Sequence, residues 1–320
     1  MILATATKKG TQRQKKVDKV VKFSRDNYPF TWLRGLRLLV QFVVTLIFNG
    51  ALFGLAVTWL TLPVQAPPTP WSITTGTIYV FQLLAINAVI PFMALAIFFL
   101  LGAIFGRFMC GWACPMGLVQ ELLALVPVRK YEPPSKTNKS WSELATLFAG
   151  SIIILVVFLG LARALGSTEA QLTQTFYVFA EDPLPAIDPA AALFSFIPYM
   201  FYWNAFPAFD FGTLAGLDIF FFWGRLLVLF VILVIPIIIP RAYCRYICPT
   251  GAIMGRFNKY SILSINRNPV LCSDCGQCDN ACPMGVRVSE WTDRVRDPMC
   301  VGCMDCAYAC EEGAIQLKVL

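Results

Sequence analysis

The 320-residue sequence contains no histidine. Without histidine, neither a b-type haem with two histidine ligands nor a C-x-x-C-H haem attachment site can form, so we expect no ordinary haem. The same absence argues against a zinc hydrolase, a Ser-His-Asp triad and a Cys-His nucleophile. A glycine-rich phosphate-binding loop is also missing from the sequence. Any proton transfer must therefore use carboxylates, tyrosines or backbone groups.

Charged residues are nearly absent from four long apolar segments. The chain is 57% hydrophobic, which is too apolar for an ordinary soluble enzyme of this length. Because about 20 apolar residues in a helix cross the hydrocarbon core, each segment can span a membrane. The segments are residues 38 to 60, 78 to 105, 144 to 162 and 219 to 240, with Arg225 as their one charged residue. We predict a membrane all-α fold with four transmembrane helices.

Lysine and arginine are distributed unevenly between the connecting segments. Residues 1 to 37 contain ten lysines and arginines and two acidic residues, whereas residues 166 to 218 contain no lysine or arginine. Basic loops remain on the cytoplasmic side, so we expect both termini in the cytoplasm and the protein in the inner membrane of a bacterium or archaeon. The net charge of +7 then reflects this bias and attraction to lipid headgroups, and requires no nucleic acid.

The segment between the third and fourth expected spans is acidic. It contains six carboxylates, at Glu169, Glu181, Asp182, Asp188, Asp210 and Asp218. We expect them on the outer face, where they could dock a partner of opposite charge. Residues 191 to 209 are uncharged, but two prolines and many aromatic residues favour an interfacial or re-entrant segment over a fifth span.

All twelve cysteines fall into spaced motifs, and none lies in the expected outward loops. This argues against a secreted disulfide framework. The tail repeats the spacing C-x2-C-x2-C-x3-C, with proline after the first copy and Glu311 after the second. This spacing is typical of two-cluster ferredoxins, in which the fourth cysteine of each run binds the other cluster. Two zinc knuckles are a weaker alternative, since zinc sites separate their cysteine pairs by a longer loop.

On that pattern each 4Fe-4S cluster takes three cysteines from one run and one from the other. Cluster 1 is expected to bind Cys272, Cys275, Cys278 and Cys310. Cluster 2 is expected to bind Cys300, Cys303, Cys306 and Cys282.

Four further cysteines lie at the ends of two expected membrane helices. They occur in two copies of R-x-x-C-x-x-x-C-P-x-G, 134 residues apart, which predicts two repeated hairpins. Residues i and i+4 of a helix lie on one face, so the pairs could meet at the inner membrane surface. The residues are Arg107, Cys110 and Cys114 in the first copy, and Arg241, Cys244 and Cys248 in the second.

Three hypotheses remain open for these membrane cysteines. They could hold a shared third metal centre, with an iron–sulfur centre as the first choice. They could be two redox-active dithiols, whose thiolates Arg107 and Arg241 would favour. They could also be buried thiols that only pack helix ends.

The expected domains follow from these motifs. A basic cytoplasmic segment, 1 to 37, precedes a four-helix transmembrane domain, 38 to 255, and a cytoplasmic α+β ferredoxin domain of the bacterial two-cluster type, 256 to 320. Arg225 is a quinone-site candidate because a membrane arginine is costly, with Asp218 two turns away as its partner. It could instead reach the headgroups.

Three aromatic residues of the outer segment are weaker quinone-site candidates. Tyr199, Tyr202 and Trp203 could line an apolar slot for a quinone ring. Interfacial anchoring explains them equally well.

Together, the four helices, the two C-x3-C-P motifs and the paired ferredoxin motifs resemble the membrane polyferredoxins of the NapH, NosR and CcoG family, from about residue 30 to 320. The resemblance implies a quinol dehydrogenase subunit that feeds electrons from the quinone pool to a respiratory complex. The implied partners are a periplasmic ferredoxin, a multihaem cytochrome or a reductase.

Length and architecture favour the NapH type within this family, because NosR-like and CcoG-like members carry additional domains. A CcoG-like maturation factor that reduces or hands on a metal such as copper is the alternative. The outward loops offer little provision for copper, since Met200 is their one soft ligand. A structural anchor with a docking ferredoxin domain is a third alternative.

Overall fold

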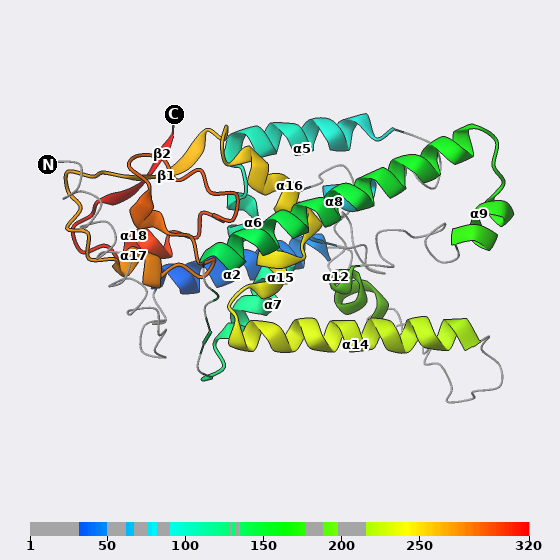
Figure 1. Cartoon of the computed structure of the whole chain (residues 1–320), viewed down its shortest axis with the longest axis horizontal. Coiled ribbons are helices and arrows are strands. Elements are labelled where there is room, and N and C mark those ends of the chain that lie inside the picture. The colour runs from blue at the N-terminus through cyan, green and yellow to red at the C-terminus, as the bar shows by residue number, and fades with distance from the viewer. Residues whose placement is uncertain are drawn as a thin grey trace, which may run out of the picture.

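The computed structural model describes residues 32–49, 62–66, 76–81, 90–128, 130–131, 133, 135–176, 188–197 and 216–319. The molecule is elongated, with helices running along its long axis and a small sheet with cysteine-rich loops at one end (Figure 1). The elements before the C-terminal region are α2 (Trp32–Phe48), α3 (Thr77–Val80), α5 (Phe92–Phe105), α6 (Phe108–Trp112), α7 (Pro115–Ala124), α8 (Ser135–Ala164), α9 (Glu169–Phe176), α12 (Pro189–Ala191), the π-helix η3 (Ala192–Phe196), α14 (Gly216–Ile238), α15 (Ala242–Tyr246) and α16 (Pro249–Phe257).

The C-terminal region is a two-stranded sheet with short helices and loops. Its elements are β1 (Leu263–Arg267), α17 (Gln277–Asn280), the 3-10 helix η4 (Val288–Glu290), α18 (Asp305–Tyr308) and β2 (Ile315–Val319). The strands pair antiparallel, with Leu263 opposite Val319 and Arg267 opposite Ile315. The first and last parts of this region are thereby held together, and both cysteine runs lie between them.

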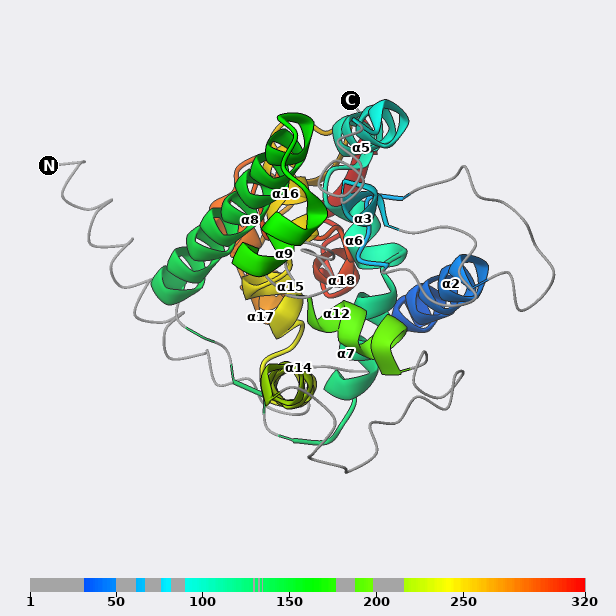
Figure 2. The same cartoon turned by 90° about the vertical axis from the view of Figure 1, so that its right-hand side faces the viewer.

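The helical part repeats itself at the spacing of the sequence motif. Helices α6 and α15 are 134 residues apart at both ends, and α7 and α16 begin 134 residues apart. The packing is reciprocal: α14 contacts α7, while α5 contacts α16. Helix α2 packs on α6 and α7, just as α8 packs on α15 and α16. Figure 2 shows α2, α5, α8 and α14 around the short helices, which lie between them.

Each pair of membrane cysteines flanks a break between two helices. Cys110 lies in α6, whereas Cys114 has an extended backbone (φ −82°, ψ 123°) and caps α7. Cys248 likewise caps α16. The single helix expected across each motif is therefore wrong. The proline after the second cysteine disfavours helical geometry at the residue before it, and is itself well placed at the first position of the next helix.

The four expected spans correspond only in part to long helices. Among the described residues, one helical stretch, Thr137–Ala164 within α8, is long and apolar enough to cross a membrane by length and composition. Two shorter apolar helices are Phe92–Phe105 and Trp223–Ile238. The expected span 38 to 60 is covered by α2 only up to Phe48, because 50 to 61 lie outside the described residues. The expected span 144 to 162 lies inside α8.

A continuous helix over residues 78 to 105 is wrong. Ile90 and Pro91 are not helical, and α5 begins only at Phe92. Proline removes a backbone donor and restricts the residue before it, which explains the interruption. At 1.5 Å per residue the 14 residues of α5 reach about 21 Å, less than the roughly 30 Å of a hydrocarbon core.

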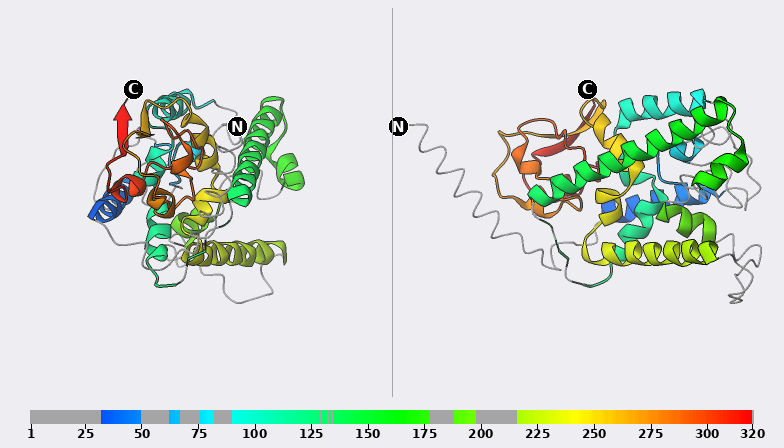
Figure 3. Two further views of the ribbon diagram at one scale, coloured as in Figure 1. Left: turned by 60° about the vertical axis from the view of Figure 1, so that its left-hand side comes forward. Right: turned by 45° about the vertical axis from the view of Figure 1, so that its right-hand side comes forward.

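One described part of the segment expected at the outer face, residues 188 to 197, packs inside the helical bundle. Ala190 is fully buried and shares one core cluster with Cys114 and Cys248. Helix α12 lies between α8 and α14 in Figure 1 and in the right-hand view of Figure 3. Most of the segment expected to be interfacial or re-entrant, residues 198 to 209, lies outside the described residues.

Candidate functional site

The cysteines assigned to cluster 2 converge in the core of the C-terminal region. Cys282, Cys303 and Cys306 are buried in one apolar cluster, and Cys300 packs against it. Burial, then Cys303 and Cys300, raises the pKa of the Cys282 thiol well above its ordinary value. The crossed cysteine from the first run therefore lies beside the second run, as the ferredoxin spacing requires.

Two of the cysteines assigned to cluster 1 lie nearer the surface, whereas Cys278 is buried. Cys275 is exposed and Cys272 is half-buried. Burial, the Asp279 carboxylate and then Cys272 raise the pKa of Cys278 to about 12. Arg267 donates to the Cys272 sulfur from Nε at 3.3 Å and from Nη2 at 3.1 Å. Such donors stabilise a thiolate that binds iron.

The structure brings the four membrane cysteines together from both halves of the repeat. Burial, then Cys244 and Cys110, raises the pKa of Cys114 to about 12. Burial, then the same two thiols and Cys114, raises the pKa of Cys248 well above its ordinary value. Cys114, Cys244 and Cys248 share one core cluster, and Cys110 lies in a second one but influences the pKa of Cys114 and Cys248. These four cysteines are here called the four-cysteine site.

At Cys110 the arginines of the motif do not outweigh the effect of burial. Burial raises the pKa of Cys110 to about 11, although Arg107 and Arg241 act in the opposite direction. Both disulfide exchange and metal ligation use the thiolate, so the raised pKa does not distinguish these two roles. All twelve cysteines are unpaired in the structure.

The donors around the four-cysteine site fit an iron–sulfur centre. The Gly251 amide donates to the Cys248 sulfur at 3.3 Å, and Gln120 Nε2 donates to the Cys244 sulfur at 3.0 Å. Among the described residues, no three metal-binding side chains converge closely enough for a single ion. A 4Fe-4S cubane has no such requirement, because each of its four cysteines binds a different iron.

A buried ion cluster lies between this site and the C-terminal region. Glu121 of α7 pairs with Arg34 at 3.2 Å, with Arg241 at 2.7 Å and with Arg37, and all four residues are buried. Burial alone would raise the pKa of Glu121, but Arg241 and Arg37 outweigh it and hold the pKa at about 2. Arg37 also pairs with Asp305 at 2.9 Å.

Among the described residues, the ion pairs of this cluster join three arginines to two carboxylates. Arg241 uses Nη2 for Glu121, whereas its Nε and Nη1 are buried and have no partner among the described residues. Buried donors without a partner are costly. An anionic centre ligated by four thiolates beside Arg241 would complement the charge of this guanidinium. We take this as the second observation that favours a metal–thiolate centre.

The helical bundle touches the loop of cluster 2 very closely. A Cβ atom on Gly111 would collide with the carbonyl oxygen of Val301, which lies between Cys300 and Cys303. Trp112 Nε1 donates to the Gly302 carbonyl at 3.1 Å. The second half makes a similar approach, because a Cβ on Gly255 would collide with the Pro298 carbonyl.

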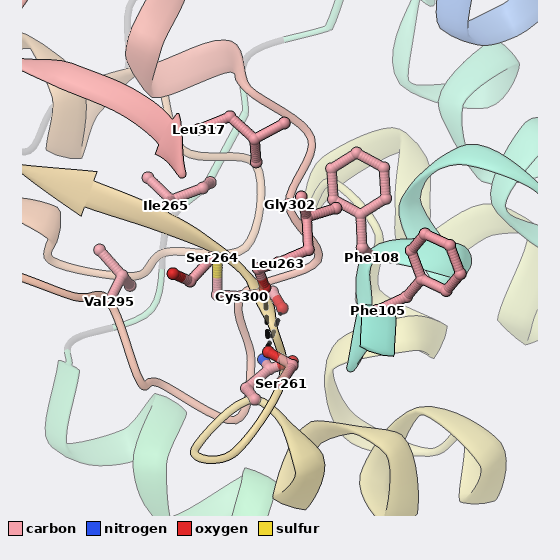
Figure 4. A pocket seen from close by; sticks show the side chains of 11 residues that line it. Phe105, Phe108, Ser261, Leu263, Ser264, Ile265, Val295, Cys300, Gly302 and Leu317 are labelled. Carbon is pink, nitrogen blue, oxygen red and sulfur yellow. Dashed lines mark hydrogen bonds between the residues drawn. The ribbon is translucent and has the colours of Figure 1, made fainter. Parts of the chain in front are cut away.

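A small cavity of about 20 Å³ lies at this junction (Figure 4). It is lined by Phe105 and Phe108 from the helical part, and by Cys300 and Leu317 from the C-terminal region. This volume accommodates about one water molecule. The cavity is therefore too small for a quinone ring.

The quinone-site candidates are only partly placed. Arg225 is half-buried in α14, and Asp218 lies in the first turn of the same helix. Tyr199, Tyr202 and Trp203 lie outside the described residues. The sequence interpretation missed Glu121 and Gln120, which follow the first C-x3-C-P motif by a helical turn or more and interrupt an apolar helix.

Two family models match the chain. The model described as a 4Fe-4S binding domain matches at residues 86–134 and 219–267, and the model described as a 4Fe-4S dicluster domain matches at residues 264–311. The first covers both C-x3-C-P motifs, and the second covers all eight cysteines of the tail. Over these residues the chain is similar to 4Fe-4S binding proteins of the ferredoxin type, which supports bound iron–sulfur clusters.

The relatives of this iron–sulfur protein are distant. It is 27% identical over 242 residues to YccM of Escherichia coli, whose name refers to electron transport; the match covers 75% of this chain and 57% of YccM. It is 24% identical to an uncharacterized protein of Methanocaldococcus jannaschii, and the match covers 68% of this chain and 67% of that protein. It is 27% identical to the regulatory protein NosR of Stutzerimonas stutzeri, with 62% and 22% covered.

The chain thus spans little more than half the length of YccM and less than a quarter of NosR. No solved structure matches it significantly. These similarities support electron transfer through iron–sulfur clusters.

Proposed function

We propose that this iron–sulfur protein is the membrane subunit of a NapH-type quinol dehydrogenase, which passes electrons between the quinone pool and a respiratory complex. The four-cysteine site holds a third iron–sulfur centre in this proposal. Cluster 2 and cluster 1 continue the path toward the surface. The clusters carry the electrons, and the protein sets their potentials and spacing.

One observation carries the proposal: four buried cysteines from two repeats meet beside the loop of cluster 2. The Gly111 backbone lies against Val301, between two of the cysteines assigned to that cluster. Burial lowers the pKa of Arg241, but Glu121 and, less strongly, Cys303 and Cys244 raise it, so Arg241 lies near both sites. Such proximity suits electron transfer between the two centres.

Membrane anchoring is part of the proposal. The apolar helix α8 supports it, and so do exposed apolar side chains on four helices. Examples are Phe42 on α2, Phe99 on α5, Ile154 on α8 and Phe230 on α14. On a water-soluble protein such large apolar side chains would form an unusual surface. The termini and the C-terminal clusters face the cytoplasm in this arrangement.

Two partner surfaces follow from the proposed path. Cluster 1 reaches a surface at the exposed Cys275, where a second redox subunit would exchange electrons. The acidic segment on the opposite side would dock a periplasmic ferredoxin, a multihaem cytochrome or a reductase. Asp188 takes no part in that docking face, because its carboxylate is directed into the bundle.

Iron and sulfide analysis of the full chain, purified without oxygen, tests the proposal. Three cubanes require about twelve irons per chain, and two require about eight. We expect about twelve in the wild type and about eight in Cys110→Ser and in Cys248→Ser, with loss of one EPR signal in both variants. Cys114→Ser and Cys244→Ser should behave alike, because all four thiols serve one centre.

Eight irons in the wild type would refute the third centre. If the four thiols then bound copper, the maturation role would replace electron transfer from quinol. Oxidation of a quinol analogue by the twelve-iron protein in vesicles, followed by cluster reduction, tests the quinol step separately. Clusters that remain oxidised there would refute the quinol link while leaving the iron–sulfur role intact.

A further inference from the structure

Asp188 lies at the start of α12 with its carboxylate inside the helical bundle. Oδ1 accepts hydrogen bonds from Tyr243 Oη at 2.7 Å and from the Ala190 amide at 3.0 Å. Oδ2 accepts from Tyr79 Oη and from Gln65 Nε2. Asp188 itself is only half-buried, whereas Gln65, Tyr79 and Tyr243 are buried. The carboxylate therefore connects a buried polar network to a partly accessible position.

The same network touches the four-cysteine site through Gln65. The Cys248 sulfur lies 3.9 Å from Gln65 Oε1, and the Cys114 sulfur lies 4.0 Å from the Gln65 carbonyl oxygen. Thr250 donates to Gln65 Oε1 at 2.6 Å and fixes this side-chain orientation. One glutamine residue thus lies between the Asp188 carboxylate and two of the four sulfurs, with its side chain next to Cys248 and its backbone next to Cys114.

Reduction of a buried centre adds one negative charge to a place with a low dielectric constant. Charges interact strongly there, because little water screens them. A carboxylate on the same network repels the added electron, and protonation of that carboxylate removes the repulsion. The coupling needs no direct contact between the carboxylate and the iron.

We propose that Asp188 is a proton-binding site coupled to the four-cysteine centre, and takes up one proton when that centre is reduced by one electron. This inference rests on the proposed third centre. In the balanced step, a centre held by the four cysteines would receive one electron from quinol, the reductant of the proposed function, and the Asp188 carboxylate takes up one proton from solvent and becomes a carboxylic acid. No other bond forms or breaks.

Burial supports this assignment, because it raises the pKa of Asp188 to about 6, although hydrogen bonds from Tyr243, the Ala190 amide and Gln65 act against it. With a pKa in this range, the carboxyl group of Asp188 changes its protonation when a negative charge appears nearby. A chain without histidine has few other groups that titrate near neutral pH.

Among the groups that surround it, the Asp188 carboxylate is the one that changes its protonation near neutral pH. The titratable groups that face it are the phenols of Tyr79 from α3 and Tyr243 from α15. Helix α14 packs on α12 and places Ile232 in the same core cluster as Ala190. The charged residues of α14, Asp218 and Arg225, precede Ile232 by about four and two helical turns.

A redox titration of the full chain in detergent tests the proposal, with the EPR signal of the four-cysteine centre followed from pH 5 to pH 9. We expect the midpoint potential to fall with rising pH above about pH 6, by up to about 59 mV per unit, since a tenfold change in an equilibrium corresponds to 59 mV for one electron. The ferredoxin clusters provide an internal reference without this slope.

Asp188→Asn is the decisive variant, because asparagine caps a helix as well as aspartate and cannot titrate. Its centre should have a pH-independent potential. Asp293→Asn removes an exposed carboxylate and should keep the wild-type slope. In infrared difference spectra, reduction should add a protonated carboxyl band that Asp188→Asn lacks.

Three outcomes would overturn the proposal. A wild-type potential without pH dependence, measured on a protein with about twelve irons, refutes the proton site and leaves the proposed function standing. A slope that persists in Asp188→Asn assigns the proton to another group. A wild type with about eight irons refutes both the proposed third centre and this inference.

Discussion

Arg37 Nη1 donates a 2.8 Å hydrogen bond to the carbonyl oxygen of Cys303, which lies 266 residues later in the chain. The same guanidinium pairs with Glu121 of α7 and Asp305 of α18. One buried side chain therefore joins the first described helix, the C-x3-C-P region and the loop of cluster 2. The position of that loop depends on this arginine.

Arg37→Met should destabilise the protein strongly. The substitution leaves Asp305 without its ion partner and removes the donor to Cys303, and breaking a buried pair costs about 3–5 kcal/mol. Thermal unfolding and iron content measure the loss. Arg37→Lys is the matched control, because it keeps the charge but lacks the fork that reaches three acceptors. An unchanged unfolding temperature in Arg37→Met would contradict this role.

The stability of the protein should fall in acid because of Glu121. Its pKa is about 2 in the folded protein and 4.5 ordinarily. A lowered pKa gives stabilisation that is complete above about pH 4.5 and is lost as the pH falls toward 2, by about 3 kcal/mol in all. Denaturant titrations between pH 6 and pH 3 measure the slope. Glu121→Gln should be less stable throughout and should lack this part of the slope.

Gly111→Ala should separate the helical bundle from the loop of cluster 2. The added Cβ meets the backbone of Val301, which cannot move aside as a flexible side chain would. Overpacking of this kind costs about 1–3 kcal/mol. We expect slower electron transfer into the ferredoxin clusters, measured by stopped-flow reduction.

Gly150→Ala is the control for Gly111→Ala. Gly150 lies in α8, and no atom of a neighbouring element lies within 4 Å of the place that an added Cβ would take. The substitution should be neutral or slightly stabilising, since alanine favours a helix more than glycine does. Equal electron-transfer rates in both variants would argue against the close contact as the route.

Arg267→Met should lower the reduction potential of cluster 1. Arg267 donates two hydrogen bonds to the Cys272 sulfur, and charge-assisted hydrogen bonds contribute roughly 1.5–3 kcal/mol each. Their loss destabilises the reduced cluster, which carries the additional negative charge. Redox titration followed by EPR measures the shift. Arg287→Met alters an exposed pair with Glu290 and should leave the potential unchanged.

The sequence predicted the features that depend on local spacing. The two runs of four cysteines and the 134-residue repeat are visible as fixed intervals, and both reappear in the structure as neighbouring sulfurs and matching helices. The helix break at Cys114 was also predictable from Pro115, because a residue before proline avoids helical geometry. The expectation of one continuous helix, based on the i, i+4 spacing of the two cysteines, was given more weight than the proline.

Contacts between distant segments could not be predicted in this way. Gln65 meets Asp188 across 123 residues and Thr250 across 185 residues, and no local pattern marks either pair. Asp188 looked like one surface acid among six, because composition does not reveal the direction of a side chain. Arg34 and Arg37 were likewise counted only among the basic residues that predict membrane orientation. In the structure both are buried and lie against Glu121.

The reciprocal packing of the repeats sets an order for biosynthesis. Helix α14 lies on α7, and Arg107 donates to the carbonyl oxygen of Cys244. Cys110 and Cys114 leave the ribosome more than a hundred residues before Cys244 and Cys248, so their site stays half-built during that interval. Insertion of a cofactor must therefore wait until the second repeat has emerged and docked on the first.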